Sequence, residues 1–179
     1  MSAQMTDDNP YSTPDAELGG GQSELYTPSI FSFSGRIGRL RYLAYGMGSY
    51  ILLMLAMIPL VGMSALTGGE PAMSGISMAI MGVIYVVMLV LAVMFAKRRL
   101  NDLNRSGWWF LLFIIPLVNL LLTIYIMFFP GTEGDNNFGP APTANSLGVQ
   151  ILGWMMPAMI VVGVLAAIAI PQFVGMPAQ

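Results

Sequence analysis

The sequence contains no cysteine and no histidine among its 179 residues. The absence of cysteine excludes disulfide bonds, thiolate nucleophiles and cysteine-ligated metal sites. The absence of histidine removes the commonest general base near neutral pH and the commonest metal ligand. We therefore expect a non-enzymatic protein that holds neither a metal nor another cofactor.

Charge is also scarce. Charged residues make up 9% of the chain, whereas hydrophobic residues make up 56%. This balance is typical of an integral membrane protein and not of a soluble domain. The seven basic residues are confined to the two short segments 36–41 and 97–105, while the acids are spread over the tail and loops. Bases that mark two membrane borders argue against a surface for nucleic acid.

Long apolar runs predict the fold class, an all-α integral membrane protein with four transmembrane helices. Each run is long enough to cross a hydrocarbon core of about 30 Å. None contains Asp, Glu, Lys or Arg. Since pumps and antiporters place ionisable groups at membrane depth, those classes of transporter are disfavoured. The four runs cover residues 43–66, 73–96, 108–129 and 149–170.

Two segments precede the first run. Residues 1–29 are rich in Pro, Gly, Ser and acids without apolar periodicity, so we predict a disordered tail. In residues 30–42, apolar side chains fall near one helical face and Arg36 and Arg39 near another. This pattern predicts a short interfacial amphipathic helix, although topogenic charge alone would also explain the arginines. The predicted domains are a tail over 1–29, a membrane domain over 30–142 and a C-terminal part over 143–179 that holds the fourth span.

The basic residues also predict the orientation. All seven flank the first run or lie between the second and third, and positive charge favours the cytoplasmic side. We therefore expect the N-terminus and the link between those runs in the cytoplasm. Residues 130–148 carry acids as their only charges and are expected on the outer side, either as a plain turn or as a weak cation site. The fourth span is oriented by alternation alone.

The link KRRLNDLNRSGWW (97–109) holds most of the candidate site residues. Asp102 lies three and four positions after Arg99 and Arg98, a spacing at which a helix pairs acid with base. Two interpretations stay open: the arginines grip an anionic headgroup while Asp102 orients them, or a salt-bridged turn fixes the angle between two spans. The candidate lipid- or partner-binding residues are Arg36, Arg39, Arg98, Arg99, Asp102, Arg105, Trp108 and Trp109.

Three separated motifs, FSFSGRIGRLRYLAY, AKRRLNDLNRSGWWFLLFIIP and GTEGDNNFGPAP, occur in this order between residues 31 and 142. Together they resemble the bacterial inner-membrane family called domain of unknown function 805. The resemblance implies a small multi-span domain in the bacterial inner membrane and brings no established activity. Where relatives often carry His before the Asp, this chain has Asn101, so a titrating imidazole is not essential here.

The fourth run carries a second resemblance. VVGVLAAIAIPQF (161–173) is similar to the apolar N-terminal helix of type IV pilins, but the Gly-Phe cleavage site and the Glu beyond it are missing. We expect the protein to stay at full length, with its fourth span packed on the others through Gly163, Ala166 and Ala167.

The sequence thus predicts a non-enzymatic inner-membrane protein whose basic cytoplasmic belt contacts anionic lipid headgroups. A membrane-protein partner or a second copy of the chain is the other partner expected. The alternative function is a small transporter or channel subunit, which a water-filled cavity would favour.

Overall fold

The computed structural model describes residues 25–66 and 75–174, and the regular structure in those residues is helical. Three α-helices of 28 residues each form the long elements. Two shorter helices lie between the second and the third of them. In chain order the helices are α1 (Arg39–Leu66), α2 (Gly75–Asp102), the 3₁₀ helix η1 (Gly107–Ile114), α3 (Pro116–Phe128) and α4 (Leu147–Val174). The predicted all-α class is confirmed.

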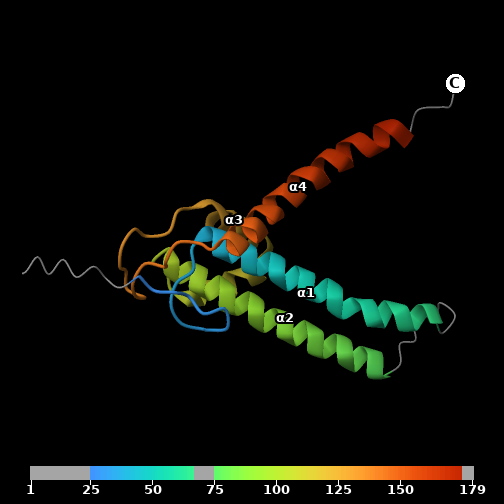
Figure 1. The fold of residues 1–179 in the computed structure, drawn as a ribbon, viewed down its shortest axis with the longest axis horizontal. Coiled ribbons are helices and arrows are strands. Elements are labelled where there is room, and N and C mark those ends of the chain that lie inside the picture. Colours follow the sequence, from blue (N-terminus) through green and yellow to red (C-terminus); the bar gives the residue numbers. More distant parts are fainter. Residues whose placement is uncertain (1–24, 67–74, 175–179) are drawn as a thin grey trace, which may run out of the picture.

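Among the described residues, α1, α2 and α4 are long and apolar enough to cross a membrane. At 1.5 Å per residue, 28 residues extend about 42 Å, which exceeds a hydrocarbon core of ~30 Å. α1 and α4 include the predicted runs 43–66 and 149–170, and α2 includes the run 73–96 from residue 75 onward. α1 and α2 lie side by side and antiparallel (Figure 1).

The third apolar run, residues 108–129, does not form one helix. It is divided between η1 and α3 at Ile115, whose backbone is extended (φ −92°, ψ 114°). Pro116 causes the break, because proline disfavours helical backbone in the preceding residue and lacks the N–H that the preceding turn would use. Asn119 then closes a hairpin by donating from Nδ2 to the carbonyl of Phe113 at 2.9 Å.

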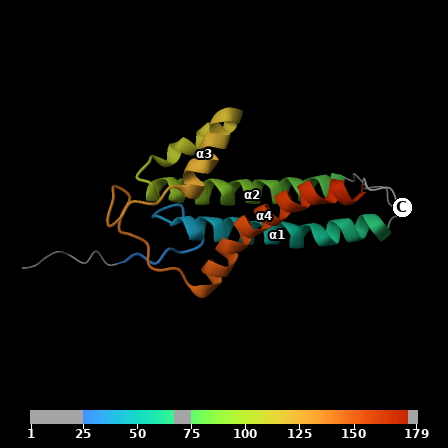
Figure 2. The same cartoon turned by 90° about the horizontal axis from the view of Figure 1, so that it is seen from above.

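Both ends of this hairpin meet the C-terminal end of α2 (Figure 2). η1 starts five residues after Asp102, and the Ile126 carbonyl near the end of α3 accepts a hydrogen bond from Arg99 at 2.8 Å. The 13 residues of α3 extend about 20 Å, too little to cross the bilayer. The predicted third crossing helix is therefore corrected to a hairpin that returns to its own end. The expected outer-side loop, residues 130–148, is corrected with it, since this loop lies at the same end as the basic link.

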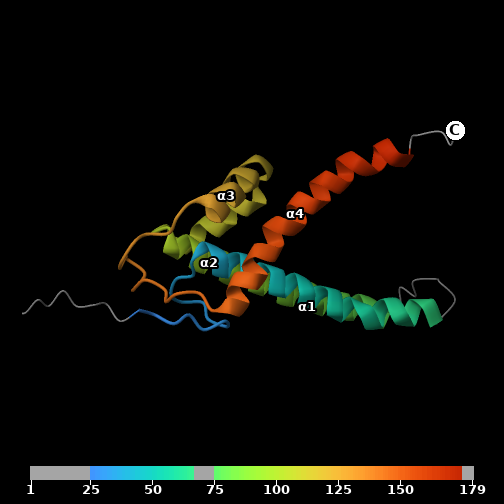
Figure 3. The ribbon, with the colours of Figure 1, turned by 45° about the horizontal axis from the view of Figure 1, so that its top comes forward.

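α4 consequently starts at the end where α1 starts, and the orientation that alternation gave it is corrected too. It crosses α1 near its own N-terminus and then diverges (Figures 1 and 3). At the crossing Gly153 is buried, and a Cβ there would lie 2.7 Å from the carbonyl oxygen of Leu40. Farther along, Gly163 has no atom within 4 Å of an added Cβ. The expected packing through Gly163 is therefore absent among the described residues, and Gly153 makes the close contact instead.

The segment before α1 is ordered but not helical. Tyr26 exchanges backbone hydrogen bonds with the loop before α4, donating to Ala141 at 3.0 Å and accepting from Thr143 at 2.9 Å. Gly35 has φ +80°, a conformation that favours glycine, and an added Cβ would overlap the Tyr26 ring. The predicted amphipathic helix over 30–42 is thus wrong except for its last four residues, which begin α1. The predicted disorder is wrong for residues 25–29, and residues 1–24 lie outside the described part of the chain.

The packed core sits at one end of the molecule, where α1 begins and α2 ends. Its apolar part consists of two clusters of buried side chains. Away from this end the long helices expose most of their apolar surface, as helices in contact with lipid do. All seven basic residues lie at this end, which we call the basic end. The buried members of the apolar clusters are Leu100, Leu103, Leu122 and Ile126, and Ile37, Met94 and Phe95.

Candidate functional site

Arg36 lies at the centre of the basic end with 1% of its surface exposed. Its Nε and Nη2 each lie 3.2 Å from Oδ1 of Asp102. The remaining donors reach the loop after α3, at the carbonyls of Thr132 (2.6 Å), Gly134 (2.6 Å) and Gly139 (3.1 Å). One guanidinium therefore joins the start of α1, the end of α2 and a loop about 100 residues later in the chain.

Arg99 occupies the other oxygen of the same carboxylate. Its Nη1 lies 2.5 Å from Oδ2 of Asp102, three residues farther along α2. Its other nitrogens donate to the carbonyls of Ile126 and Phe129 at the end of α3. A cation is favoured there, because the unpaired carbonyls at a helix C-terminus carry the negative end of its dipole. Arg99 thus fixes the returning arm of the hairpin to α2.

The main chain of Asp102 completes this cluster. Its carbonyl oxygen accepts hydrogen bonds from the backbone N–H of Thr132 at 2.8 Å and from the Thr132 hydroxyl at 3.1 Å. Nearby, Nδ2 of Asn136 donates to the carbonyl of Asn101 at 2.8 Å. The 130–140 loop therefore supplies hydrogen-bonding groups to the C-terminal end of α2. We call Arg36, Arg99, Asp102, Thr132 and Asn136 the arginine cluster.

Arg98 and Arg41 hold the flanking segments. Arg98 is fully buried and donates through Nη1 to the carbonyls of Ser29 and Ile30, at 2.8 and 3.2 Å. Its Nε and Nη2 have no partner in the described residues. Arg41 donates to the Thr143 hydroxyl at 3.1 Å and to the Ala144 carbonyl at 2.9 Å, just before α4. These two arginines tie the segments on either side of the long helices to the basic end.

The remaining candidates lie at the surface. Arg39 is exposed and donates to the Phe128 carbonyl at 3.0 Å. Arg105 is exposed, and its guanidinium carbon lies 5.3 Å from the ring centre of Trp109, within the range of a cation–π contact. Trp108 is 74% exposed. The exposed surfaces of these side chains can meet a ligand or the membrane surface.

The eight predicted candidates thus separate into two groups. Arg36, Arg98, Arg99 and Asp102 are buried in contacts within the chain, whereas Arg39, Arg105, Trp108 and Trp109 face outward. The predicted pairing of Arg99 with Asp102 is confirmed, and the described residues contain no ion pair of Asp102 with Arg98. Arg41, Lys97 and Thr143 were missed as site residues. No local pattern marks Arg41, because its burial, which makes a partner necessary, is seen only in the structure.

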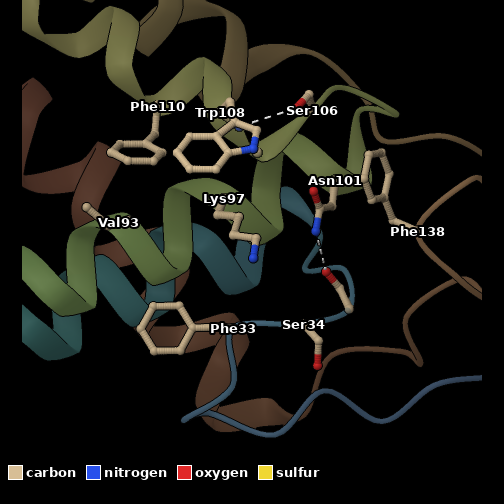
Figure 4. A pocket seen from close by; sticks show the side chains of 11 residues that line it. Phe33, Ser34, Val93, Lys97, Asn101, Ser106, Trp108, Phe110 and Phe138 are labelled. Atoms are coloured by element: carbon tan, nitrogen blue, oxygen red, sulfur yellow. Dashed lines mark hydrogen bonds between the residues drawn. The ribbon is translucent and has the colours of Figure 1, made fainter.

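A cavity of about 620 Å³ opens beside the arginine cluster (Figure 4). Residues 33–35, α2 and the start of η1 form its walls together with Phe138. Lys97 and Asn101 supply its charged and amide groups. Neither residue was among the predicted site residues.

The family described as "Protein of unknown function (DUF805)" matches residues 30–140, more than half of the chain. This chain belongs to the DUF805 family. The predicted membership is confirmed, while the resemblance of the last span to a pilin helix stays a prediction. All three motifs that carry the resemblance meet at the basic end, where they supply both the arginine cluster and the walls of the cavity.

Two Escherichia coli K12 proteins are similar to parts of this chain. Inner membrane protein YhaH is 51% identical over 45 residues, which are 25% of this chain and 37% of YhaH. Inner membrane protein YhaI is 34% identical over 73 residues, which are 40% of this chain and 62% of YhaI. The chain therefore spans less than two thirds of the length of either relative. No solved structure matches the chain.

Proposed function

We propose that this DUF805 protein is a non-enzymatic inner-membrane protein whose basic end lies at the cytoplasmic surface and contacts anionic phospholipid. The names of the two relatives support the membrane assignment. The orientation is supported by the gathering of all seven basic residues at one end, since positive charge favours the cytoplasmic side. In this arrangement α1, α2 and α4 cross the membrane, and the hairpin of η1 and α3 does not.

The observation that carries the proposal is the excess of positive charge at this end. The described residues contain seven basic side chains and three acidic ones, Asp102, Glu133 and Asp135, which leaves four positive charges. A basic residue near an anionic membrane surface contributes about 1 kcal/mol to binding. The three acids among the described residues leave this excess in place, and an anionic lipid surface would stabilise it.

The basic residues have different roles in the structure. The buried arginines hold the loops, whereas Arg39, Arg105 and Trp108 are exposed and Trp109 lies against Arg105. Tryptophan is enriched where a membrane protein meets the headgroup region. We therefore assign the lipid contact to the four exposed candidates, Arg39, Arg105, Trp108 and Trp109, and call them the belt.

Quenching of tryptophan fluorescence by brominated lipids tests this assignment. The chain has three tryptophans, so a Trp154→Phe variant restricts the signal to Trp108 and Trp109. In nanodiscs, brominated phosphatidylglycerol should quench this signal more strongly than an equal fraction of brominated phosphatidylcholine. Added salt should reduce the difference, because it screens exposed charges.

Replacing Arg39 and Arg105 with Gln should lower the preference for phosphatidylglycerol about fivefold per arginine, the equivalent of ~1 kcal/mol each. Asp135→Asn serves as the control, because it changes one exposed charge of the opposite sign at the same end. Equal quenching by both lipids, or an unchanged preference in the Arg39→Gln/Arg105→Gln protein, would refute the belt.

A further inference from the structure

The cavity beside the arginine cluster has a polarity gradient along α2. Val93, Lys97 and Asn101 all line it, and they follow one another at intervals of four residues, about 6 Å along the helix. The gradient runs from an apolar side chain through a cation to an amide. Toward the far end of α2 the same face continues with Leu89 and Tyr85, which are 51% and 69% exposed. A ligand with an apolar part and an anionic head matches this order.

Lys97 supplies the cation. No ion pair or hydrogen bond engages its ammonium within the described residues. Its stem is held by Gly107, because a Cβ at that position would lie only 2.5 Å from Lys97 Cγ. Figure 4 shows the side chain extending past the rings of Phe33, Trp108 and Phe110. Packing thus directs one unpaired positive charge to an aromatic-walled cavity.

Asn101 supplies a second, independent sign of a ligand. The residue is 4% exposed, and its Oδ1 has no partner in the described part of the chain. Nδ2 donates to the Gly35 carbonyl at 3.2 Å, which fixes the amide so that Oδ1 turns away from that loop (Figure 4). A buried carbonyl oxygen without a donor costs about 1–3 kcal/mol. A hydroxyl group on the ligand would remove that cost.

We propose that this cavity binds one molecule of an anionic phospholipid with a hydroxylated headgroup, of which phosphatidylglycerol is the simplest. The phosphate pairs with Lys97, a headgroup hydroxyl donates to Oδ1 of Asn101, and the acyl chains run past Val93 along the exposed face of α2. The volume of about 620 Å³ lies in the usual range for ligand sites. The inference rests on the proposed function, since it gives one lipid a defined seat at the same end.

The charge of the surroundings selects the headgroup. Among the described residues that line the cavity, Lys97 carries the one charge, and the lining includes no carboxylate. The ammonium headgroup of phosphatidylethanolamine would meet this positive charge at close range. A neutral glycerol headgroup would not. The cavity should therefore prefer phosphatidylglycerol to phosphatidylethanolamine.

Lys97 is the only lysine in the sequence, so its acylation tests the proposal on the unmodified protein. The probe is acetic anhydride, and peptide mass spectrometry separates Lys97 from the N-terminal amine. In nanodiscs that contain phosphatidylglycerol, Lys97 should react at least about fivefold more slowly than in phosphatidylcholine, the equivalent of ~1 kcal/mol. Phosphatidylethanolamine should give little protection. Equal reaction rates in all three lipids would overturn the proposal.

Retained lipid provides the second measurement. After detergent washing, native mass spectrometry should find one phosphatidylglycerol on the wild-type protein and on Lys97→Arg, and at least tenfold less on Lys97→Met. The Arg39→Gln/Arg105→Gln protein is the matched control and should keep this lipid. Retention by Lys97→Met equal to wild type would overturn the cavity and leave the belt standing. Loss of the lipid from the Arg39→Gln/Arg105→Gln protein but not from Lys97→Met would also overturn the cavity and leave the belt standing.

A soluble phosphate ester tests whether the cavity binds the phosphate of a lipid headgroup or that of a free phosphate ester. Glycerol 3-phosphate added to phosphatidylcholine nanodiscs should not slow the acylation of Lys97, because it lacks the acyl chains that the α2 face would hold. Protection as strong as that by phosphatidylglycerol would assign the cavity to soluble phosphate esters and overturn the lipid assignment.

Discussion

Gly131 lies against the carboxylate of Asp102, so close that a side-chain carbon at Gly131 would overlap that carboxylate. Its φ angle is not in the left-handed region, so the need for glycine here is steric and not conformational. The motif GTEGDNNFGP thus begins with a glycine because the loop must pass directly over the acid that neutralises two buried arginines.

Replacing Gly131 with Ala should therefore lower the stability of the protein. The added methyl group has to displace a carboxylate that Arg36 and Arg99 hold from two sides, and such overpacking costs about 1–3 kcal/mol. Thermal unfolding in mild detergent would measure the change. Gly82→Ala is the control: an added Cβ there meets no atom within 4 Å, and alanine favours a helix interior by up to about 1 kcal/mol. Equal unfolding temperatures for the two variants would contradict the steric account.

Asp102→Asn should cost more than the glycine change. Asparagine keeps the size of the side chain but removes the negative charge between two buried guanidinium groups, and breaking a buried pair typically costs about 3–5 kcal/mol. The free energy of unfolding in detergent is the measurement. Glu133→Gln removes an exposed charge from the same end and should be close to neutral. A small loss of stability in both Asp102→Asn and Glu133→Gln would mean that water already screens the charges of the cluster.

The hairpin makes a prediction about sidedness. Because the chain has no native cysteine, single cysteines report position on a clean background. Ser106→Cys and Asn137→Cys should react with a membrane-impermeant maleimide from the same side, and Gly75→Cys, at the start of α2, should react from the other side. Labelling of Asn137→Cys from the same side as Gly75→Cys would restore a third crossing helix and exclude the hairpin.

The crossing of α1 and α4 gives a matched pair of glycine variants. Gly153→Leu should separate the two helices, because even a Cβ at Gly153 lies 2.5–2.7 Å from the side chain and carbonyl oxygen of Leu40. Gly163→Leu, ten residues along the same helix, should leave thermal stability unchanged, since Gly163 faces open space. A loss of stability in the Gly163 variant but not in the Gly153 variant would place the packing of α4 where the small-residue pattern first suggested it.

Hydropathy and local spacing were sufficient for three long helices and for the Arg99–Asp102 pair. Both signals are local: an apolar run of sufficient length predicts a span, and a spacing of three residues predicts an ion pair on one helix. The same reasoning failed at residues 108–129, where enough apolar residues are present but Pro116 divides them between two short helices. The number of apolar residues shows that a run is long enough to cross the membrane. It does not show that a break such as the one at Pro116 lets the chain turn back.

The role of Arg36 could not be predicted from sequence for a different reason. Its partners Asp102 and Gly139 lie 66 and 103 residues away, and nothing in the local pattern shows which of the seven bases will be buried. An arginine before a span looks like topogenic charge whether it meets lipid or carboxylate. Only the return of the hairpin brings the third motif back to the first, whereas the length of the apolar run at residues 108–129 favoured a crossing helix over a hairpin bent at Pro116.

The distance in sequence between these partners also sets an order in time. At synthesis rates of about 5–20 residues per second, Arg36 waits roughly 5–20 s before the loop that supplies three of its acceptors is made. Until then neither Arg36 nor Arg99 has its full set of partners, and the basic end stays open. We therefore expect the cluster to close only after α1 and α2 have been inserted. Closure requires residues 130–140 to be on the same side of the membrane as Arg36, so we expect the cluster to form only in a chain that is inserted in this way.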